Sequence, residues 1–136
     1  MRLLPRVACL WLLVVVAGCP VGTTSGRFRP AQGPAGVDAQ LVLDRQRGTV
    51  TGELLAMRDT GFVLLVGNRV TLVRYEAIRS ATFPQVASAS LGRQPPTPAM
   101  RERLRLVSRF PQGISPELEQ RLLAGYSQPT IDVIEP

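Results

Sequence analysis

"TVTGELLAMRDTGFVLLVGNRVTLVRY", residues 49–75, carries the clearest structural signal in this chain. Three runs rich in β-branched and apolar residues are separated in it by two short turns, a pattern typical of consecutive antiparallel strands. The first turn, residues 58–61, contains Asp59, whose carboxylate can accept a hydrogen bond from the backbone two residues on. The second is Gly67-Asn68, the composition of a two-residue hairpin loop with positive φ. The stretch therefore predicts three strands that follow one another as a meander.

One further strand is expected on each side of this stretch. "LVLDRQ" at residues 41–46 precedes it, and "RSATF" at residues 79–83 follows it after one tight turn. Gly52 stands in the middle of the longest run, where a glycine usually marks a bulge or a sharp bend. Residues 41–84 therefore predict a small, strongly bent meander or barrel of five strands. Because two short helices are expected after it, the predicted fold class is mainly β within an α+β chain.

The same residues resemble the Sm-like small β-barrel. The resemblance is carried by "GELLAMRDTGFVLLV", the hairpin, "VTLVRYEAI" and the last strand, and it implies a five-stranded barrel. RNA-binding Sm proteins carry an Asp and an Asn in one loop and an Arg-Gly pair in another. Here no Asn follows Asp59, and "VRYEA" at residues 73–77 stands at the place of the Arg-Gly pair, so we expect the fold but no nucleic acid. Glu53, Asp59 and Glu76 are then predicted to be solvated turn and edge residues.

The chain after the meander is expected to contain a second linker, two short helices and a tail. Thr97 and Ser115 each precede a proline and have the composition of helix N-caps. Gly125 is the expected C-cap of the second helix. The tail either adds an edge strand through its apolar residues or is loose. The predicted ranges are 85–98 for the linker, 99–127 for the helices and 128–136 for the tail.

In the first of these helices, Met100, Leu104 and Val107 recur at i, i+4 and i+7 and predict one apolar face. A strand is the competing interpretation, because Leu104 and Leu106 alternate with arginines. Three arginines at four-residue spacing lie on another face of the helix, where they are either solvated or in contact with a partner or an anion. These candidates for partner or anion contact are Arg101, Arg105 and Arg109.

The N-terminus has the organisation of an export signal. "MRLLPR", residues 1–6, carries two positive charges, and residues 7–17 are apolar throughout. Eleven residues of helix rise only about 16 Å, roughly half of the hydrocarbon core of a bilayer. The run is therefore too short to span a membrane, and residues 1–18 are predicted to be a signal peptide that is removed.

The segment Val16-Ala17-Gly18-Cys19 resembles the lipobox of bacterial lipoproteins, in which an aliphatic residue and two small residues precede a cysteine. The resemblance implies that a diacylglyceryl group is attached to the Cys19 sulfur and that a signal peptidase cuts between Gly18 and Cys19. With two or more fatty acyl chains on this residue, attachment to a membrane is durable. Cys9 leaves with the signal peptide, so the mature chain is expected to have no disulfide and no free thiol.

Residues 19–40 are expected to be the lipidated cysteine and a flexible linker, because Gly, Pro, Ser and Thr recur in them without periodicity. Arg27 and Arg29 flank Phe28 there, and these three residues either contact an anionic surface or reflect composition alone. Pro20 stands where lipoproteins retained at the inner membrane typically carry an aspartate. The expected location is therefore the cell envelope, on the outer membrane facing the periplasm if the cell is Gram-negative.

Composition narrows the classes of function. The 136 residues include no histidine, two cysteines and sixteen basic residues, all of them arginine, against ten acidic residues. Neither a histidine nor a mature thiol is left to act as a general base, nucleophile or zinc ligand. No Gly-x-Ser-x-Gly motif and no phosphate-binding loop is present in the sequence. We therefore expect no enzyme, no metal and no cofactor other than the covalent lipid on Cys19.

Two functions remain after these exclusions. The first is a membrane-anchored, non-catalytic interaction module that docks on a protein partner in the envelope. The alternative is an arginine-mediated binder of anionic envelope ligands, such as lipid headgroups or glycan phosphates. The two differ in salt dependence, since contacts between arginine and phosphate weaken as the ionic strength rises.

Overall fold

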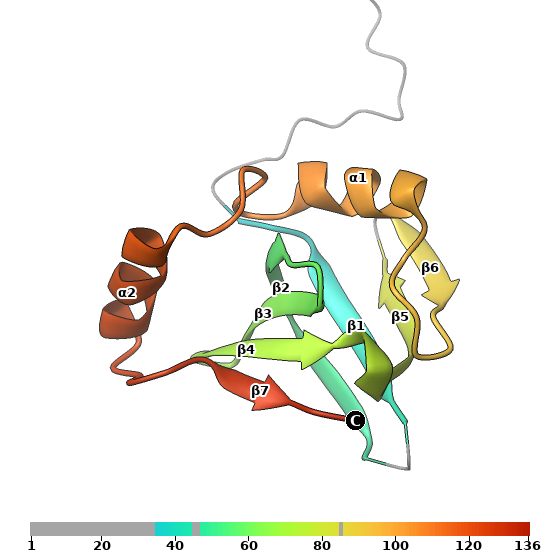
Figure 1. Cartoon of the computed structure of the whole chain (residues 1–136), viewed down its shortest axis with the longest axis horizontal. Coiled ribbons are helices and arrows are strands. Elements are labelled where there is room, and N and C mark those ends of the chain that lie inside the picture. Colours follow the sequence, from blue (N-terminus) through green and yellow to red (C-terminus); the bar gives the residue numbers. More distant parts are fainter. Residues whose placement is uncertain (1–34, 45–46, 85) are drawn as a thin grey trace, which may run out of the picture.

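The computed structural model describes residues 35–44, 47–84 and 86–136, which form one mixed sheet of seven strands and two short helices (Figure 1). The expected class, mainly β within α+β, is confirmed. The expected signal peptide, the lipobox and most of the first linker, residues 1–34, lie outside the described residues. The elements are β1 Asp38–Leu43, β2 Thr49–Met57, β3 Gly61–Val66, β4 Arg69–Arg74, the 3₁₀ turn η1 Tyr75–Ala77, β5 Ile78–Phe83, β6 Ala87–Ser90, α1 Pro98–Val107, α2 Pro116–Gly125 and β7 Asp132–Ile134.

The strand order is β6-β5-β1-β2-β3-β4-β7, and the pairs are antiparallel except for β4 with β7. Strand β1 pairs with both β2 and β5, so the fifth strand of the meander returns to lie beside the first. Closing the meander into a barrel would also need β4 to pair with β5. Instead η1 links these two strands, β4 pairs with β7 and β5 pairs with β6. The sheet is strongly curled but open.

Two strand boundaries differ from the prediction. Strand β1 begins at Asp38, inside the expected first linker, because its backbone pairs with β2 from Asp38 onward. Strand β6 lies inside 85–98, the stretch predicted to be a linker, and pairs with β5 from Ser80 to Phe83. Small residues and a proline suggested a linker there, but the backbone of β5 offers an edge that any extended segment can pair with.

The bulge in β2 lies at Leu55, three residues beyond the predicted position at Gly52. The register between β2 and β3 shifts between Leu54 and Ala56, so Leu55 and Ala56 both face the same side of the sheet. Gly52 itself is needed for a different reason. A Cβ atom at this position would lie 2.4 Å from the carbonyl oxygen of Leu65, so β3 could not approach as closely.

Buried side chains form two clusters on opposite faces of the sheet. In β3, Phe62 and Leu64 point into one cluster and Val63 into the other, since alternate side chains of a strand face opposite sides. The larger cluster, called the inner core below, comprises Ala39, Leu41, Leu43, Leu54, Phe62, Leu64, Val73, Tyr75, Ile78, Ala81, Phe83, Leu91 and Leu104. The smaller cluster, called the outer core, comprises Leu55, Ala56, Val63, Val70, Leu72 and Leu123.

Each helix covers one of these cores. Leu104 of α1 is completely buried in the inner core, and Met100 packs against the same cluster, which confirms the predicted apolar face for these two residues. Val107, the third residue of that face, is half-buried and belongs to neither core. Leu123 of α2 is 9% exposed and belongs to the outer core. A ten-residue helix is too short to be stable alone, and burying a leucine side chain contributes about 1.5–3 kcal/mol. Both helices therefore depend on the sheet.

The predicted helix starts are confirmed, whereas the predicted end of the second helix is wrong. The side chain of Thr97 accepts a hydrogen bond from the backbone N–H of Met100 at 3.4 Å, and that of Ser115 accepts one from Leu118 at 3.3 Å. Each donor is the third residue of its helix, as expected for an N-cap. Gly125 is the last residue of α2 and Tyr126 is the cap. The left-handed residue that turns the chain away is Ser127, with φ of 52°, so the reversal occurs two residues later than predicted.

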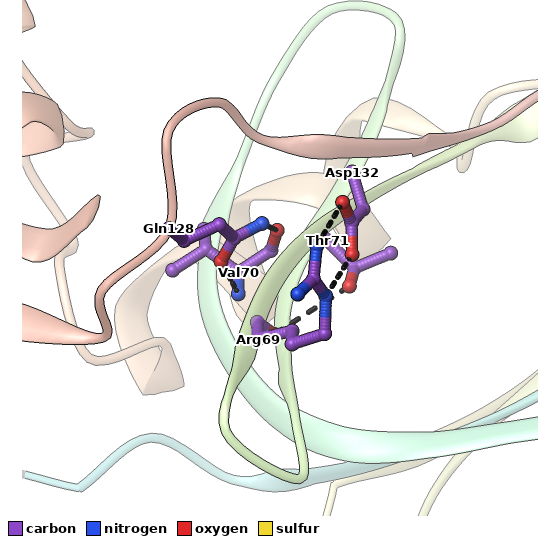
Figure 2. A network of polar contacts seen from close by, with 5 residues as sticks. All are labelled: Arg69, Val70, Thr71, Gln128 and Asp132. Atoms are coloured by element: carbon purple, nitrogen blue, oxygen red, sulfur yellow. Dashed lines mark hydrogen bonds and ion pairs between the residues drawn. The ribbon is translucent and has the colours of Figure 1, made fainter.

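The C-terminal segment is fastened to β4 by side chains from both partners (Figure 2). The buried amide of Gln128 accepts from the backbone N–H of Val70 at 2.8 Å and donates to its carbonyl at 2.9 Å. Arg69 donates two hydrogen bonds to the carboxylate of Asp132 at 2.5 and 2.7 Å. Strand β7 follows in parallel register with β4, so of the two alternatives for the tail the edge strand is confirmed.

Candidate functional site

The candidate residues fall into two groups with respect to the structure. Cys19 and the preceding Val16, Ala17 and Gly18 lie outside the described residues. The remaining candidates, the three arginines predicted to share a helix face, are all described.

Arg109 does not lie on the helix. Helix α1 ends at Val107, and Ser108 already has extended backbone angles. The backbone N–H of Arg109 donates to the carbonyl of Leu54 at 3.0 Å, so residue 109 runs beside β2. Its guanidinium donates two hydrogen bonds, both of 2.7 Å, to the carboxylate of Glu53. The prediction that Arg109 shares a helix face with Arg101 and Arg105 is therefore wrong.

Glu53 is the acceptor of this polar cluster, and its predicted solvated position is wrong. Its side chain is 16% exposed, and that of Arg109 is 25% exposed. Besides Arg109, its carboxylate accepts from the backbone N–H of Gly36 at 2.5 Å. Glu53 thus joins β2 to the residue that precedes β1 and to the segment that follows α1. Its partners lie 17 and 56 residues away, so no local pattern could have indicated them.

Arg101 and Arg105 lie on α1 and also pair with carboxylates of the same chain. Arg101 lies 3.2 Å from a carboxylate oxygen of Asp59, in the turn between β2 and β3. Arg105 donates to both carboxylate oxygens of Glu102, at 2.8 and 2.7 Å, and to the carbonyl of Pro111 at 2.7 Å. The hydrogen bonds from Arg105 hold the pKa of Glu102 below its usual value.

Seven of the eleven arginines in the described part of the chain pair with a carboxylate. That part holds eleven arginines and ten acidic residues, whereas the whole sequence has sixteen and ten. The positive excess of the whole chain therefore lies mainly outside the described residues. The ion pairs are Arg58–Glu119, Arg69–Asp132, Arg74–Glu135, Arg93–Asp44, Arg101–Asp59, Arg105–Glu102 and Arg109–Glu53.

The outward side of α1 presents a different set of residues. Ala99, Arg103 and Leu106 are exposed and lie at i, i+4 and i+7, which places them in one stripe opposite Leu104. Arg103 has no ion-pair partner among the described residues. Leu106 and Val133 are the two large hydrophobic side chains exposed in the described part, at 50% and 46%. Leu106 belongs to α1, which runs along the top of Figure 1, and Val133 to β7, which lies low in the same view.

Two hollows on the surface are lined by described residues. The larger, of about 200 Å³, contains no ionisable side chain and lies between β6 and the start of α1. The smaller, of about 10 Å³, has room for one water molecule and lies beside the end of β7. The larger is lined by Ala89, Leu91, Gln94, Pro95, Thr97 and Met100, and the smaller by Asp44, Arg47, Glu76, Ala77, Arg93, Glu135 and Pro136.

The described residues hold neither a metal-binding cluster nor a helix that could span a membrane. No three acidic, histidine or cysteine side chains there stand close enough together to hold a metal ion. Neither α1 nor α2 has the length and apolar composition that crossing a membrane requires, and residues 35–44, 47–84 and 86–136 contain no other α-helix.

Comparison of the chain with family models, with curated proteins and with solved structures finds no match.

Proposed function

We propose that this chain is a lipid-anchored, non-catalytic binding domain of the bacterial cell envelope. The observation that carries the proposal is the order of features at the N-terminus. A basic start is followed by an apolar run of eleven residues, and this run ends in Val16-Ala17-Gly18-Cys19. An acylated Cys19 would hold the folded domain at a membrane through residues 20–34.

The finer fold that we propose for residues 38–83 is a small barrel of the Sm-like kind. Support comes from the position of β1 between β2 and β5, from the bulge in β2 and from the single turn η1 that links β4 to β5. A meander that curls far enough to pair its first and fifth strands has most of the geometry of a small barrel.

The partner that we propose is another protein of the envelope, docked on the edges of the sheet. Strands β6 and β7 are the two edge strands, and an extended segment of a partner can pair with such an edge. The pairing of Arg101, Arg105 and Arg109 speaks against the alternative, a phosphate binder built on these residues. An incoming phosphate would have to displace a carboxylate that already neutralises each of the three.

The test of the anchor is the substitution Cys19→Ser. In the bacterium that makes the chain, this variant should accumulate as an uncleaved precursor without acyl mass, because the attachment atom is lost. Intact mass and incorporation of labelled palmitate measure the difference. The matched control is Cys9→Ser, which removes the other cysteine and should leave acylation and cleavage unchanged. A wild-type mature chain without lipid mass would refute the proposed anchor.

A further inference from the structure

We propose that the outward stripe of α1, formed by Ala99, Arg103 and Leu106, rests on the anionic headgroups of the membrane that holds the anchor. This inference rests on the proposed lipidation of Cys19 and adds an orientation of the domain relative to the bilayer. The exposed Leu106 would enter the headgroup boundary, and Arg103 would lie beside lipid phosphates.

The first argument is the place at which the N-terminal segment joins the domain. The backbone N–H of Val37 donates to the carbonyl of Val107, the last residue of α1, at 3.1 Å. Gly36 donates to Glu53, which also binds Arg109 just beyond the helix. Figure 1 shows β1 starting beside the C-terminal end of α1. The residues that lead toward Cys19 therefore leave the domain on the α1 side.

The length of that segment limits the distance between α1 and the membrane. Fifteen residues separate Cys19 from Ala35, the first described residue. Whatever their conformation, they cannot span more than about 55 Å, at 3.3–3.6 Å for each residue. If the segment between Cys19 and Ala35 takes a direct path, the side of the domain that carries α1 is the one nearest the membrane. For β7 to contact the membrane, the segment would have to pass around the domain.

The second argument is charge. Helix α1 holds three arginines and one glutamate, whereas α2 holds one arginine and two glutamates. Within the α1 surface, Arg101 is neutralised by Asp59 and Arg105 by Glu102, so Arg103 is the surplus cation. Two more arginines, Arg27 and Arg29, stand in the undescribed segment with no acidic residue among residues 20–34. Each arginine close to an anionic bilayer is attracted to it by about 1 kcal/mol, so the sign of the charge favours anionic lipid.

The third argument is the contrast between the two exposed apolar side chains. Leu106 lies beside the surplus cation Arg103, three residues away on the same face of α1. The exposed Glu102 shares this face, but its charge is neutralised by Arg105 on the same helix. Val133 lies between Asp132 and Ile134 on β7, and Asp132 and Glu135 are paired with Arg69 and Arg74. An apolar side chain beside an unpaired cation is the pattern of an interfacial helix, so the stripe on α1 fits a lipid surface better than β7 does.

The experiment uses the lipidated full-length mature protein in vesicles of phosphatidylcholine, with or without phosphatidylglycerol. Acylation blocks Cys19, so a cysteine introduced by Ala99→Cys or by Ala124→Cys is the single free thiol for an environment-sensitive fluorophore. Both alanines are exposed on ten-residue helices, which makes Ala124 on α2 the matched control. We expect a blue shift of the emission from position 99 when phosphatidylglycerol is present, and none from position 124.

Two substitutions in the Ala99→Cys background test the cause of the shift. Arg103→Glu should abolish most of it, whereas Arg121→Glu on the exposed side of α2 should leave it unchanged. Leu106→Ser should reduce the shift, and Val133→Ser should not. All four side chains are exposed, so circular dichroism should show an unchanged fold for each variant.

The outcomes separate this inference from the proposed anchor, because the mass of each sample reports acylation independently. An acylated protein whose label shifts equally at positions 99 and 124, or at neither, would overturn the orientation and leave the anchor intact. A shift at position 99 of equal size without phosphatidylglycerol would overturn the role of Arg103. A mature chain without acyl mass would overturn the anchor and the orientation together.

Discussion

The two helices of this protein are alike in size and start but differ in how the sheet holds them. Each has ten residues, each begins with a proline, and each is capped by a hydroxyl side chain. Helix α1 covers the inner core through Leu104, and the segment after it is bound to β2 by Arg109 and by backbone hydrogen bonds. Helix α2 covers the outer core through Leu123, and the segment after it is bound to β4 by Gln128.

This difference separates the side chains that attach each helix to the sheet from those that are exposed and can contact another molecule. Arg101 on α1 and Glu119 on α2 pair with residues of the turn after β2, and Arg109 and Gln128, which follow the helices, bind β2 and β4. Their outward sides are not alike, since α1 exposes Leu106 while the exposed residues of α2 are small or polar, as at Gln120 and Ala124. Half of the Leu106 surface is exposed, and we assign this exposed part to an external contact.

The largest effect on the free energy of unfolding is expected when the buried leucine of each helix is replaced by alanine. Leu104→Ala should lower the free energy of unfolding by about 3–4 kcal/mol, and Leu123→Ala by about 2 kcal/mol, because a fully enclosed leucine leaves the larger cavity. Urea unfolding of the two variants measures the difference. Equal losses would mean that the outer core is packed as tightly as the inner core, and the comparison of the helices would lose its basis.

The next effect concerns the segment after α2. Gln128→Ala should lower the free energy of unfolding by about 2–3 kcal/mol, because it leaves the buried N–H and carbonyl of Val70 without their partners. Amide hydrogen exchange at Val70 should become faster in the same variant. Gln120→Ala, at an exposed position on α2, is the control and should change stability by less than about 0.5 kcal/mol.

A smaller effect is expected for the polar cluster after α1. Glu53→Gln should cost about 1–2 kcal/mol, since it removes the charge that pairs with the largely buried Arg109. The matched control is Glu119→Gln, which breaks the more exposed pair with Arg58 and should cost about 0.5 kcal/mol or less. A cycle with Arg109→Gln isolates the pair itself. If Glu53→Gln and Glu119→Gln cost the same, the segment after α1 is not held more firmly than α2.

The comparison also shows what the sequence predicts well and where it stops. The N-caps Thr97 and Ser115, the hairpin between β3 and β4 and the apolar face of α1 are specified by neighbouring residues, and the structure confirms them. The end of α1 has a local signal too, because Pro111 disfavours helical backbone at the preceding residue. That signal argues against placing Arg109 on the same helix face as Arg101.

Features that depend on distant partners carry no such signal. Gln128 meets Val70 across 58 residues, and Glu53 meets Arg109 across 56. Both side chains are polar and lie in segments that look solvated when they are taken alone. The edge strands β6 and β7 are similar, because a short extended segment becomes a strand only where an unpaired backbone edge is already present.

The smallest effects are expected for two exposed ion pairs, one between the neighbouring strands β4 and β7 and one within α1. Hydrogen bonds from Arg69 hold the pKa of Asp132 below its usual value, and those from Arg105 do the same for Glu102. A lowered pKa means that each pair stabilises the fold above the ordinary pKa of its carboxyl and stops doing so as the pH falls through the lower, folded value. Both carboxyl groups are exposed, so only a shallow decline of stability is expected at acidic pH.

The two pairs connect different parts of the chain, and amide exchange can measure the consequence. Arg69 and Asp132 are 63 residues apart and join β4 to β7, whereas Glu102 and Arg105 lie on one turn of α1. The pair between Glu102 and Arg105 connects residues of a single helix, so it affects only α1. The pair between Arg69 and Asp132 connects β4 to β7, so it helps to hold the C-terminal segment in place. Asp132→Asn should therefore flatten the acidic limb of stability against pH and speed amide exchange in β7, while Glu102→Gln should change exchange in α1 alone. If Asp132→Asn left exchange in β7 unchanged, the hold on this segment would belong to Gln128 and the parallel pairing with β4.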